Sequence, residues 1–314
     1  MKLKPYINQG PYIVLEDDNI LQSYGICDLK LTKSEVDLDN IFIETNLNKK
    51  VSYLNSKTKI KLYYNENLMT REKKLGEGSY GKIYLYSFED KSVVLKIPEK
   101  GISLDYETSI VKKYLPDVCR HHTIPFKVIL DQNNNEFLIM QQANGDLDDL
   151  KLDDRLKLKL ILTITKMLNC FYNKGIVYGD LKLENILYRC KNDKINIFLG
   201  DIGSFFKIGD YISEGYYIPP EALDNKNYIV NKEFLLYNLG SFIAEIYGLQ
   251  KGLEYKNNTL STFTKYRYPK IVKRITSSKI PKNIKALILA LIHPNKNERA
   301  KFDLETVFYL IDSK

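Results

Sequence analysis

Three polar side chains with complementary chemistry lie in the segment YGDLKLENILY, residues 178–188. Asp180 could accept or orient the proton of a hydroxyl group. Lys182 could stabilise the charge of a phosphoryl group during its transfer, and Asn185 could serve as a neutral ligand of a metal ion. Together these residue types predict a phosphoryl-transfer site.

A second acidic turn follows sixteen residues after Asn185. The apolar run 195–199 leads into GDIG at 200–203, where Asp201 could hold Mg²⁺ against phosphate groups. The alternative is two unrelated aspartate-containing turns, but their order and spacing favour one site that binds a metal and a nucleotide.

A glycine-rich segment, GEGSYG at 76–81, lies between two predicted strands. Gly76, Gly78 and Gly81 can adopt backbone conformations closed to other residues and bring N–H groups close to phosphate oxygens. The same residues also form ordinary hairpin turns, so the segment alone is a weak indication. A strand rather than a helix follows it, which argues against a dinucleotide-binding fold.

A lysine and a glutamate further along could complete the phosphate site. Lys96 ends the strand-like run VVLK and could reach the α and β phosphates, although a lysine there can also be an edge or snorkelling residue. The residues three, four and seven positions after Glu107 are Ile, Val and Tyr, which places Glu107 on the inward face of a helix over 103–115. Glu107 could hold Lys96 in place, or it could be a chance surface residue.

The elements that would position these residues change character near residue 70. Upstream, the short apolar pieces 12–15, 41–43 and 60–64 predict a β-rich or irregular extension without a recognisable motif. Downstream, strands are predicted over 74–78, 82–88, 93–97, 128–130 and 137–140, and helices over 103–115, 158–173, 232–247 and 284–292. A sheet lobe followed by a helical lobe leaves a cleft in which ligands commonly bind.

Composition limits the class of protein. The chain has 314 residues, 44% of them hydrophobic, with no secretory signal and no apolar run longer than 286–292, so we expect a soluble globular protein. Four cysteines without a CxxC pair and three histidines predict no metal cluster and reduced thiols in a cytoplasmic or nuclear protein. An abundance of Lys, Asn, Ile and Tyr is typical of AT-rich genomes, such as those of parasites or large DNA viruses, so a virus-infected host cell is one candidate setting. The cysteines are Cys27, Cys119, Cys170 and Cys190.

The net charge of +8 is concentrated near the C-terminus. Residues 251–314 contain 14 Lys and Arg against 5 Asp and Glu, a net of +9, whereas residues 1–70 contain nine of each. Segments such as KYRYPKIVKR at 265–274 could attract an acidic substrate, a nucleic acid or an anionic surface. A solvated face of a lysine-rich protein is the alternative reading.

The order of these motifs resembles the eukaryotic-type protein kinase family, of the serine/threonine type, over about residues 71–310. The resemblance implies an α+β, two-lobed fold with ATP and Mg²⁺ as cofactors and a protein substrate. An extension over 1–70 would precede a kinase domain over 71–314. Its small β-rich N-lobe would span about 71–140 and its larger helical C-lobe about 146–314.

The resemblance also assigns residues to the site. Asp180 and Lys182 would be catalytic, and Asn185 and Asp201 would bind metal. Met140 would guard the back pocket at the start of a hinge over 140–145, where backbone groups of Gln141 and Ala143 would contact adenine. The full ATP-binding set would be Leu75, Gly76, Gly78, Ser79, Gly81, Ile83, Val94, Lys96, Glu107, Met140, Gln141, Ala143 and Leu187. A buried Glu221–Arg299 ion pair is implied as well.

Three positions depart from the family pattern. Tyr178 replaces the usual histidine, Gly179 the arginine, and Leu235 an aspartate; Tyr178 and Leu235 could be a matched apolar replacement. The missing arginine would normally receive a phosphate on the activation segment. Because only 15 residues, 204–218, separate DIG from PPE, we expect a pre-formed segment that needs no phosphate on Ser204 or Ser213.

Three functions remain open at this point. The first is an active serine/threonine kinase, which Lys182 favours by resemblance. The second is a pseudokinase that binds nucleotide or serves as a scaffold, because residues 178, 179 and 235 are degenerate. The third is a small-molecule phosphotransferase of the aminoglycoside or choline kinase type, against which the PPE at 219–221 argues.

Overall fold

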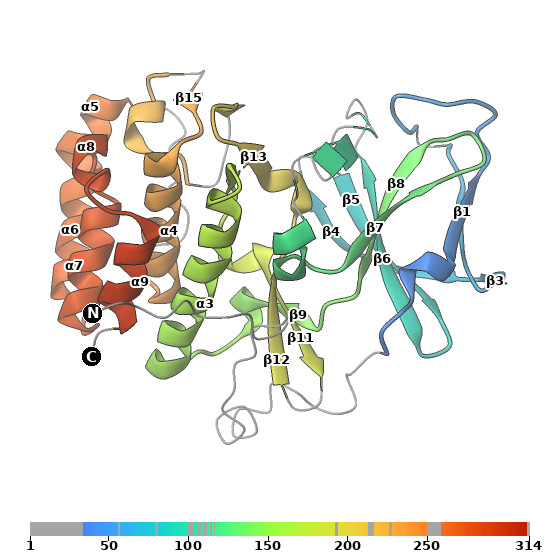
Figure 1. Cartoon of the computed structure of the whole chain (residues 1–314), viewed down its shortest axis with the longest axis horizontal. Helices are drawn as coiled ribbons and strands as arrows, with labels where there is room; N and C mark the ends of the chain where they lie inside the picture. Colours follow the sequence, from blue (N-terminus) through green and yellow to red (C-terminus); the bar gives the residue numbers. More distant parts are fainter. Residues whose placement is uncertain are drawn as a thin grey trace.

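The computed structural model describes residues 34–55, 57–78, 81–98, 103, 105, 108–109, 112–113, 115, 117–191, 194–212, 217–225, 228–249 and 259–312. A sheet-rich lobe lies at one end of the molecule and a helical lobe at the other, with short strands between them (Figure 1). This is the two-lobed α+β fold that the sequence predicts.

A five-stranded antiparallel sheet in the order β4-β5-β6-β8-β7 forms the N-lobe. The strands are β4 Thr70–Gly78, β5 Gly81–Phe88, β6 Lys91–Pro98, β7 Phe126–Leu130 and β8 Glu136–Gln141. Tight turns join β5 to β6 and β7 to β8, and Glu89 and Asn134 there have positive φ angles of 53° and 60°. Short polar turns between strands rich in branched and aromatic residues keep the sheet antiparallel.

The described part of the extension is a second layer on this sheet. It contains the short 3₁₀ helix η2 Leu38–Asn40 and an antiparallel sheet of β1 Ile41–Thr45, β2 Ile60–Tyr64 and β3 Asn67–Leu68. Ile43 and Leu62 share one buried cluster with Val93 and Ile139 of the N-lobe sheet. Figure 1 shows β1 and β3 at the end of the molecule farthest from the helices.

Strand β6 divides its side chains between two hydrophobic cores. Val93 and Leu95 belong to the core shared with the extension, whereas Val94 belongs to the large core that continues into the helical lobe. Because successive side chains of a strand point to opposite faces, Lys96 points to the same side as Val94.

The C-lobe is built around α4 Lys232–Ile246, which is buried from Phe234 to its end. Around it lie α3 Asp154–Tyr172, α5 Leu260–Thr262, the π-helical turn η8 Phe263–Arg267, α6 Tyr268–Ser277, α7 Lys282–Leu291, α8 Lys296–Arg299 and α9 Leu304–Asp312. The Asp153 and Asn231 side chains cap α3 and α4 by accepting backbone N–H groups. A Cβ at Gly240 would stand 2.5 Å from the Cβ of Leu291, so glycine permits the close contact of α4 with α7.

Short elements hold the loops between the lobes. Three small antiparallel sheets pair β10 Ile176–Tyr178 with β13 Phe205–Lys207, β14 Tyr211–Ile212 with β15 Tyr228–Ile229, and β11 Ile186–Lys191 with both β12 Lys194–Leu199 and β9 Gly145–Asp146. Single 3₁₀ turns complete them: η3 Asp117–His122, η4 Leu147–Asp149, η5 Leu183–Asn185, η6 Ile202–Ser204 and η7 Pro220–Ala222.

One expectation about cysteine differs from the structure. Cys119 of η3 and Cys170 of α3 form a disulfide with Cα atoms 6.0 Å apart, whereas the sequence predicts reduced thiols. Cys190 of β11 is disulfide-bonded as well. Both residues lie where η3 packs on α3, so the fold brings together cysteines 51 positions apart.

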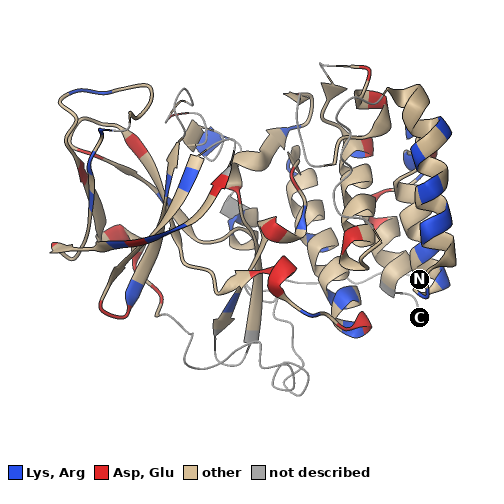
Figure 2. Cartoon of the chain, turned by 180° about the vertical axis from the view of Figure 1, so that it is seen from behind, with Lys and Arg blue, Asp and Glu red and all other residues tan. Residues whose placement is uncertain are grey.

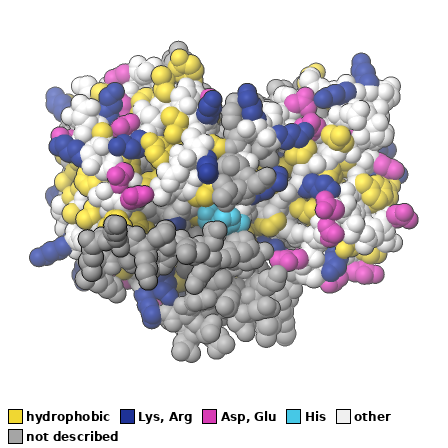
Figure 3. Space-filling model, viewed as in Figure 1, with side chains coloured by type: hydrophobic (Ala, Val, Ile, Leu, Met, Phe, Trp, Pro, Cys, Tyr) yellow, Lys and Arg dark blue, Asp and Glu magenta, His cyan; other side chains and the backbone are white. Residues whose placement is uncertain are grey.

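The described surface has a mixed character. Hydrophobic side chains on the face seen in Figure 3 are scattered among charged ones. Within the described part of the chain, no helix has the length and apolar character needed to cross a membrane.

Candidate active site

The lysine of β6 meets the aspartate of the DIG turn. Lys96 is only 6% exposed, and its Nζ lies 2.9 Å from Oδ1 of Asp201. The predicted helix partner of Lys96, Glu107, lies outside the described residues. This ion pair joins the N-lobe sheet to a loop of the C-lobe.

Asp201 is held by several groups at once. Its backbone has a positive φ of 33°, and the hydroxyl of Ser204 donates to Oδ2 at 2.7 Å. Burial by itself would raise the pKa of Asp201, but the charge of Lys96, the hydrogen bonds from Lys96 and Ser204, and the charge of Lys182 keep it below its ordinary value. The carboxylate is therefore ionised at neutral pH, the form that binds a divalent cation.

Asp180, Lys182 and Asn185 lie on one short loop. Oδ2 of Asp180 is 2.8 Å from Nζ of Lys182 and accepts a hydrogen bond of 2.8 Å from Nδ2 of Asn185. The same amide nitrogen donates to the carbonyl of Asp180 at 2.8 Å. With its nitrogen directed at Asp180, the amide of Asn185 keeps its oxygen for another ligand.

Backbone hydrogen bonds lock this loop to the DIG turn. The N–H of Gly179 donates to the carbonyl of Ser204 at 2.8 Å, and the N–H of Gly200 donates to the carbonyl of Asn185 at 2.7 Å. Strands β10 and β13 pair beside them. The two predicted motifs are therefore one rigid unit.

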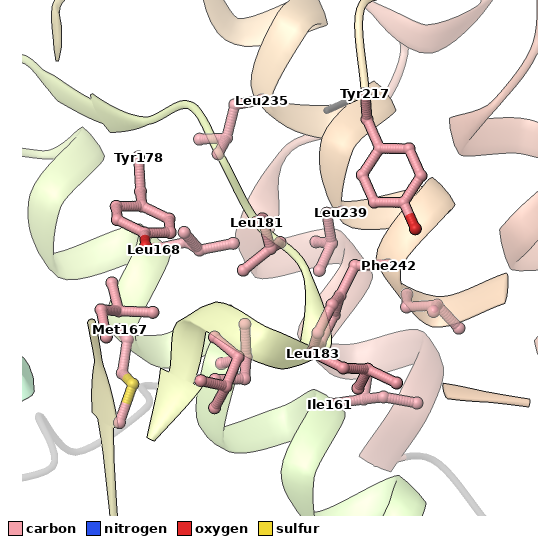
Figure 4. Close-up of a cluster of buried hydrophobic side chains, with 14 of the residues drawn as sticks. Ile161, Met167, Leu168, Tyr178, Leu181, Leu183, Tyr217, Leu235, Leu239 and Phe242 are labelled. Carbon is pink, nitrogen blue, oxygen red and sulfur yellow. The ribbon is translucent and has the colours of Figure 1, made fainter. Parts of the chain in front are cut away.

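Tyr178 adds a third link, at a position where the family has histidine. Its hydroxyl donates to the carbonyl of Gly200 at 2.9 Å, and its ring packs edge-on against Phe205. Burial, followed by the charges of Asp201 and Asp180, raises the pKa of Tyr178, so the donor proton stays in place. Figure 4 shows Tyr178 in a buried cluster with Leu181 and Leu235, which fits the predicted apolar replacement.

Most of the predicted adenine-binding side chains lie together. The large core cluster contains Val94 and Met140, with Ile83, Ala143 and Leu187 packed against it. Leu75 is 44% exposed and does not belong to this buried cluster. In the glycine-rich hairpin, Gly76 pairs with Ile83 and Gly78 with Gly81, while Ser79 lies outside the described residues.

The predicted ion pair after the activation segment is confirmed. Arg299 is fully buried and donates to Oε1 of Glu221, and it also donates to the carbonyls of Glu233 and His293. The hydroxyl of Tyr228 on β15 donates to the same Glu221 oxygen at 2.8 Å. Tyr228 thereby connects this pair to β14 of the activation segment.

Ser204 is one of the two serines of the activation segment on which the sequence predicts that no phosphate is needed. Ser204 is buried, and its hydroxyl is directed at Asp201. The other of these serines, Ser213, lies outside the described residues. The sequence did not predict three hydrogen-bonded contacts: Ser204 with Asp201, Tyr228 with Glu221, and the side chain of Gln141 with Val36. Only Ser204 had a local signal, since it directly follows DIG.

Comparison with known proteins agrees with this geometry. Residues 69–305 match the protein kinase domain. A probable serine/threonine-protein kinase, fhkB of Dictyostelium discoideum, is 29% identical over 236 residues, which cover 68% of this chain and 20% of that protein. Sporulation protein kinase mde3 of Schizosaccharomyces pombe is 26% identical over 228 residues, covering 60% of this chain and 39% of that protein.

A solved structure shares the fold. The kinase PK-1 of Cydia pomonella granulovirus aligns with a TM-score of 0.55 at 23% identity, over 78% of this chain and 92% of that chain. The chain spans 16% to 26% of the length of the first curated relatives it matches. Since the family match covers most of the chain and coincides with the lobes described above, this chain belongs to the protein kinase domain family.

Proposed function

We propose that this chain is an active protein kinase that transfers the γ-phosphoryl group of Mg²⁺-ATP to serine or threonine hydroxyls of proteins. One observation carries the proposal: Asp201, which pairs with Lys96 of β6, lies on a turn that is hydrogen-bonded to the loop of the Asp180–Lys182 pair. A kinase needs a phosphate-binding cation, a metal-binding carboxylate and a hydroxyl-orienting carboxylate in one place.

The residues divide the work as follows. Lys96 binds the α and β phosphates, and Asp180 accepts and orients the substrate hydroxyl proton. Lys182, 2.8 Å from Asp180, stabilises the negative charge of the phosphoryl group during its transfer. Each group is fixed before substrate binds, which lowers the reorganisation required during the reaction.

The donor atoms suit Mg²⁺. Asp201 offers an ionised carboxylate, and Asn185 offers an amide oxygen whose nitrogen is already engaged. Hard oxygen donors are what Mg²⁺ prefers, and the metal usually retains phosphate and water ligands besides. When bound, Mg²⁺-ATP supplies the transferable phosphoryl group and the metal charge that neutralises it.

The preference for serine and threonine follows from resemblance. The similar proteins named above include serine/threonine kinases, and Lys182 occupies the position typical of that branch. A pseudokinase remains the alternative because of Tyr178, Gly179 and Leu235. A small-molecule phosphotransferase is less well supported, since Glu221 and Arg299 form the ion pair that the protein kinase resemblance implies.

Three substitutions test the proposal in the full chain. Lys96→Met, Asp180→Asn and Asp201→Asn should each abolish phosphoryl transfer to a protein while leaving a folded chain. Asp201→Asn should weaken Mg²⁺-ATP binding, whereas Asp180→Asn should mainly lower turnover. Wild type that binds Mg²⁺-ATP yet transfers phosphate no faster than Asp180→Asn would identify a pseudokinase. Transfer to small alcohols but not to proteins would favour the third function.

We further propose that the substrate is acidic and is drawn to α6. The described stretch 259–297 contains nine Lys and Arg and no Asp or Glu. Lys270 and Lys273 are exposed one helical turn apart, and no described carboxylate forms an ion pair with either. In Figure 2, the ribbon of the helices at the edge of the C-lobe is coloured blue at several Lys and Arg positions.

The position of α6 suits docking rather than catalysis. The helical stretch that leads into α6 begins beside the end of the activation segment, where Asp224 accepts the backbone N–H of Leu260 at 3.2 Å. From there α6 lies at the end of the molecule opposite β1 (Figure 1). An acidic segment of a substrate could bind along it while a distant hydroxyl reaches Asp180.

A further inference from the structure

The side chain of Gln141 is committed to the extension. Gln141 ends β8 and is the second residue of the hinge over 140–145. Its Oε1 accepts the backbone N–H of Val36 at 3.2 Å. Its Nε2 donates to the carbonyl of the same Val36. Val36 is 3% exposed and Gln141 is buried as well, so a residue 105 positions away in the chain occupies both ends of this amide.

The neighbours of Val36 extend the contact to both lobes. Ser34 donates from Oγ to Oδ2 of Asp90 at 2.6 Å, in the turn between β5 and β6. Glu35 lies 3.5 Å from NH1 of Arg189, which belongs to β11. Three consecutive residues thus contact the N-lobe, the hinge and a strand beyond the hinge. We call residues 34–36 the strap.

The main chain of the hinge shows what the strap can control. The N–H of Gln141 donates to the carbonyl of Pro125 at 2.8 Å and is therefore not available to a ligand. Ala143, two positions later, has no backbone hydrogen-bond partner among the described residues. The resemblance to protein kinases assigns the adenine contacts to backbone groups of Gln141 and Ala143, and the placement of both residues depends on Gln141.

We propose that Gln141 is a positioning residue for nucleotide binding, through which the strap holds the hinge in the conformation that accepts adenine. The inference rests on the proposed binding of ATP at the hinge. Replacing Gln141 by an apolar residue would leave the N–H and carbonyl of Val36 buried without partners, a cost greater than that of the lost bonds themselves. The strap would then separate from the hinge, and the ordering of residues 141–143 would have to occur when nucleotide binds.

A purely structural role for Gln141 makes a different prediction. In that case, the loss of any contact between the extension and the N-lobe would weaken ATP binding to the same extent. Thr45 offers the matched control, because its hydroxyl donates to Oδ2 of Asp131 at 2.6 Å in the β7–β8 turn, at the other side of the extension. Thr45→Val removes an extension contact without touching the hinge.

The experiment measures Kd in the full chain by calorimetry for Mg²⁺-ATP and for Mg²⁺-tripolyphosphate, which has no adenine. Gln141→Met keeps the side-chain length and should raise the Kd for ATP by about five- to tenfold, as expected for two lost hydrogen bonds. The Kd for tripolyphosphate should not change, and Thr45→Val should alter neither value. An unchanged ATP Kd in Gln141→Met, or an equal rise of the ATP Kd in Thr45→Val, overturns this inference and leaves the proposed function standing.

Two further outcomes are decisive. Wild type that binds tripolyphosphate but not ATP overturns the proposed function together with this inference. If Gln141→Met does not fold, the Ser34→Ala/Glu35→Ala double variant removes the flanking contacts of the strap and leaves the buried residues intact. A rise of about twofold in the ATP Kd of that variant supports the inference, and no change overturns it.

Discussion

The ring of Phe206 lies directly over Gly179. A Cβ built on Gly179 would stand 2.6 Å from Cε2 of that ring, closer than any side chain tolerates. The position where the family has a phosphate-receiving arginine is therefore filled by an aromatic side chain of the activation segment itself. Pairing of β13 with β10, and of β14 with β15, fixes the same segment by backbone hydrogen bonds.

This packing predicts activity without phosphorylation of the activation segment. A phosphate can shift a conformational equilibrium only through contacts that differ between the two states. Phosphatase-treated wild type should keep its activity on a protein substrate within about twofold. A loss of tenfold or more, equivalent to about 1.4 kcal/mol, would reveal an activation switch.

Removing the ring of Phe206 should lower activity, whereas removing phosphate should not. Phe206→Ala should lower phosphoryl transfer by roughly tenfold, because the segment loses its packing beside Gly179 and must be ordered during catalysis. Tyr211→Ala is the matched control, since Tyr211 is an aromatic residue of the same segment that is 68% exposed. The measurement is the steady-state rate of each variant at saturating nucleotide. An equal loss of activity in Phe206→Ala and Tyr211→Ala would contradict the prediction.

Ser204 should tune the metal site. Ser204→Ala removes the hydrogen bond to Asp201, so half-maximal activity should require roughly three- to tenfold more Mg²⁺, with full recovery at high Mg²⁺. Ser204→Asp should abolish transfer, because a second carboxylate would lie beside Asp201. An activated Ser204→Asp variant would show instead that this serine is a regulatory phosphorylation site.

Charge on α6 should affect association with acidic substrates. Lys270→Glu/Lys273→Glu should raise KM for an acidic protein and leave kcat, and the kinetics of a neutral peptide, unchanged. The effect should diminish with added salt, because exposed charges are screened over about 8 Å at physiological ionic strength. Reversing the exposed Lys57 and Lys61 of the extension gives the same change in net charge elsewhere. Equal effects of the two double variants would exclude a specific docking surface.

The buried His122 predicts an acid-sensitive stability. Burial, and then the charge of His121, lower the pKa of His122 from 6.5 to about 4. Between these values the unfolded chain binds a proton that the folded chain does not, so the free energy of unfolding should fall as pH drops, by at most about 3 kcal/mol. Urea unfolding should give free energies of unfolding for wild type and His122→Gln that converge as the pH falls toward 4. Parallel curves would mean that His122 is not responsible.

The disulfide can be tested by reduction. If Cys119 and Cys170 are joined in solution, their reduction should lower the free energy of unfolding by about 2–4 kcal/mol. Cys119→Ala should lose this part of the response to a reducing agent and keep any part that comes from the disulfide of Cys190. Peptide mapping without reduction should recover the 119–170 linkage. Free thiols at both positions would agree with the reducing compartment that the sequence predicts.

Sequence reasoning succeeded where the signal was local. The periodic helix expected over 232–247 is α4, Lys232–Ile246, and the β-branched run 93–97 lies within β6. The order of the motifs predicted that Lys96 and Asp201 share one site, and the two side chains form an ion pair.

Contacts between segments far apart in the chain could not be predicted from the sequence. Nothing in the short strands before residue 70 specifies which surface they cover, and Val36 meets Gln141 only because the whole sheet is in place. Cys119 and Cys170 have no motif spacing that predicts a bond. Ser204 looks like an exposed hydroxyl until the turn after Asp201 directs it inward.

The apolar base of the catalytic loop has a thermal consequence. Tyr178 and Leu235, which replace polar residues of the family, are buried together with Leu181 (Figure 4). Contacts of this kind derive their strength largely from the entropy of released water, and they weaken as temperature falls. The attachment of the loop to α4 is therefore weakest in the cold, and turnover at low temperature should decline more steeply than the chemical barrier alone requires.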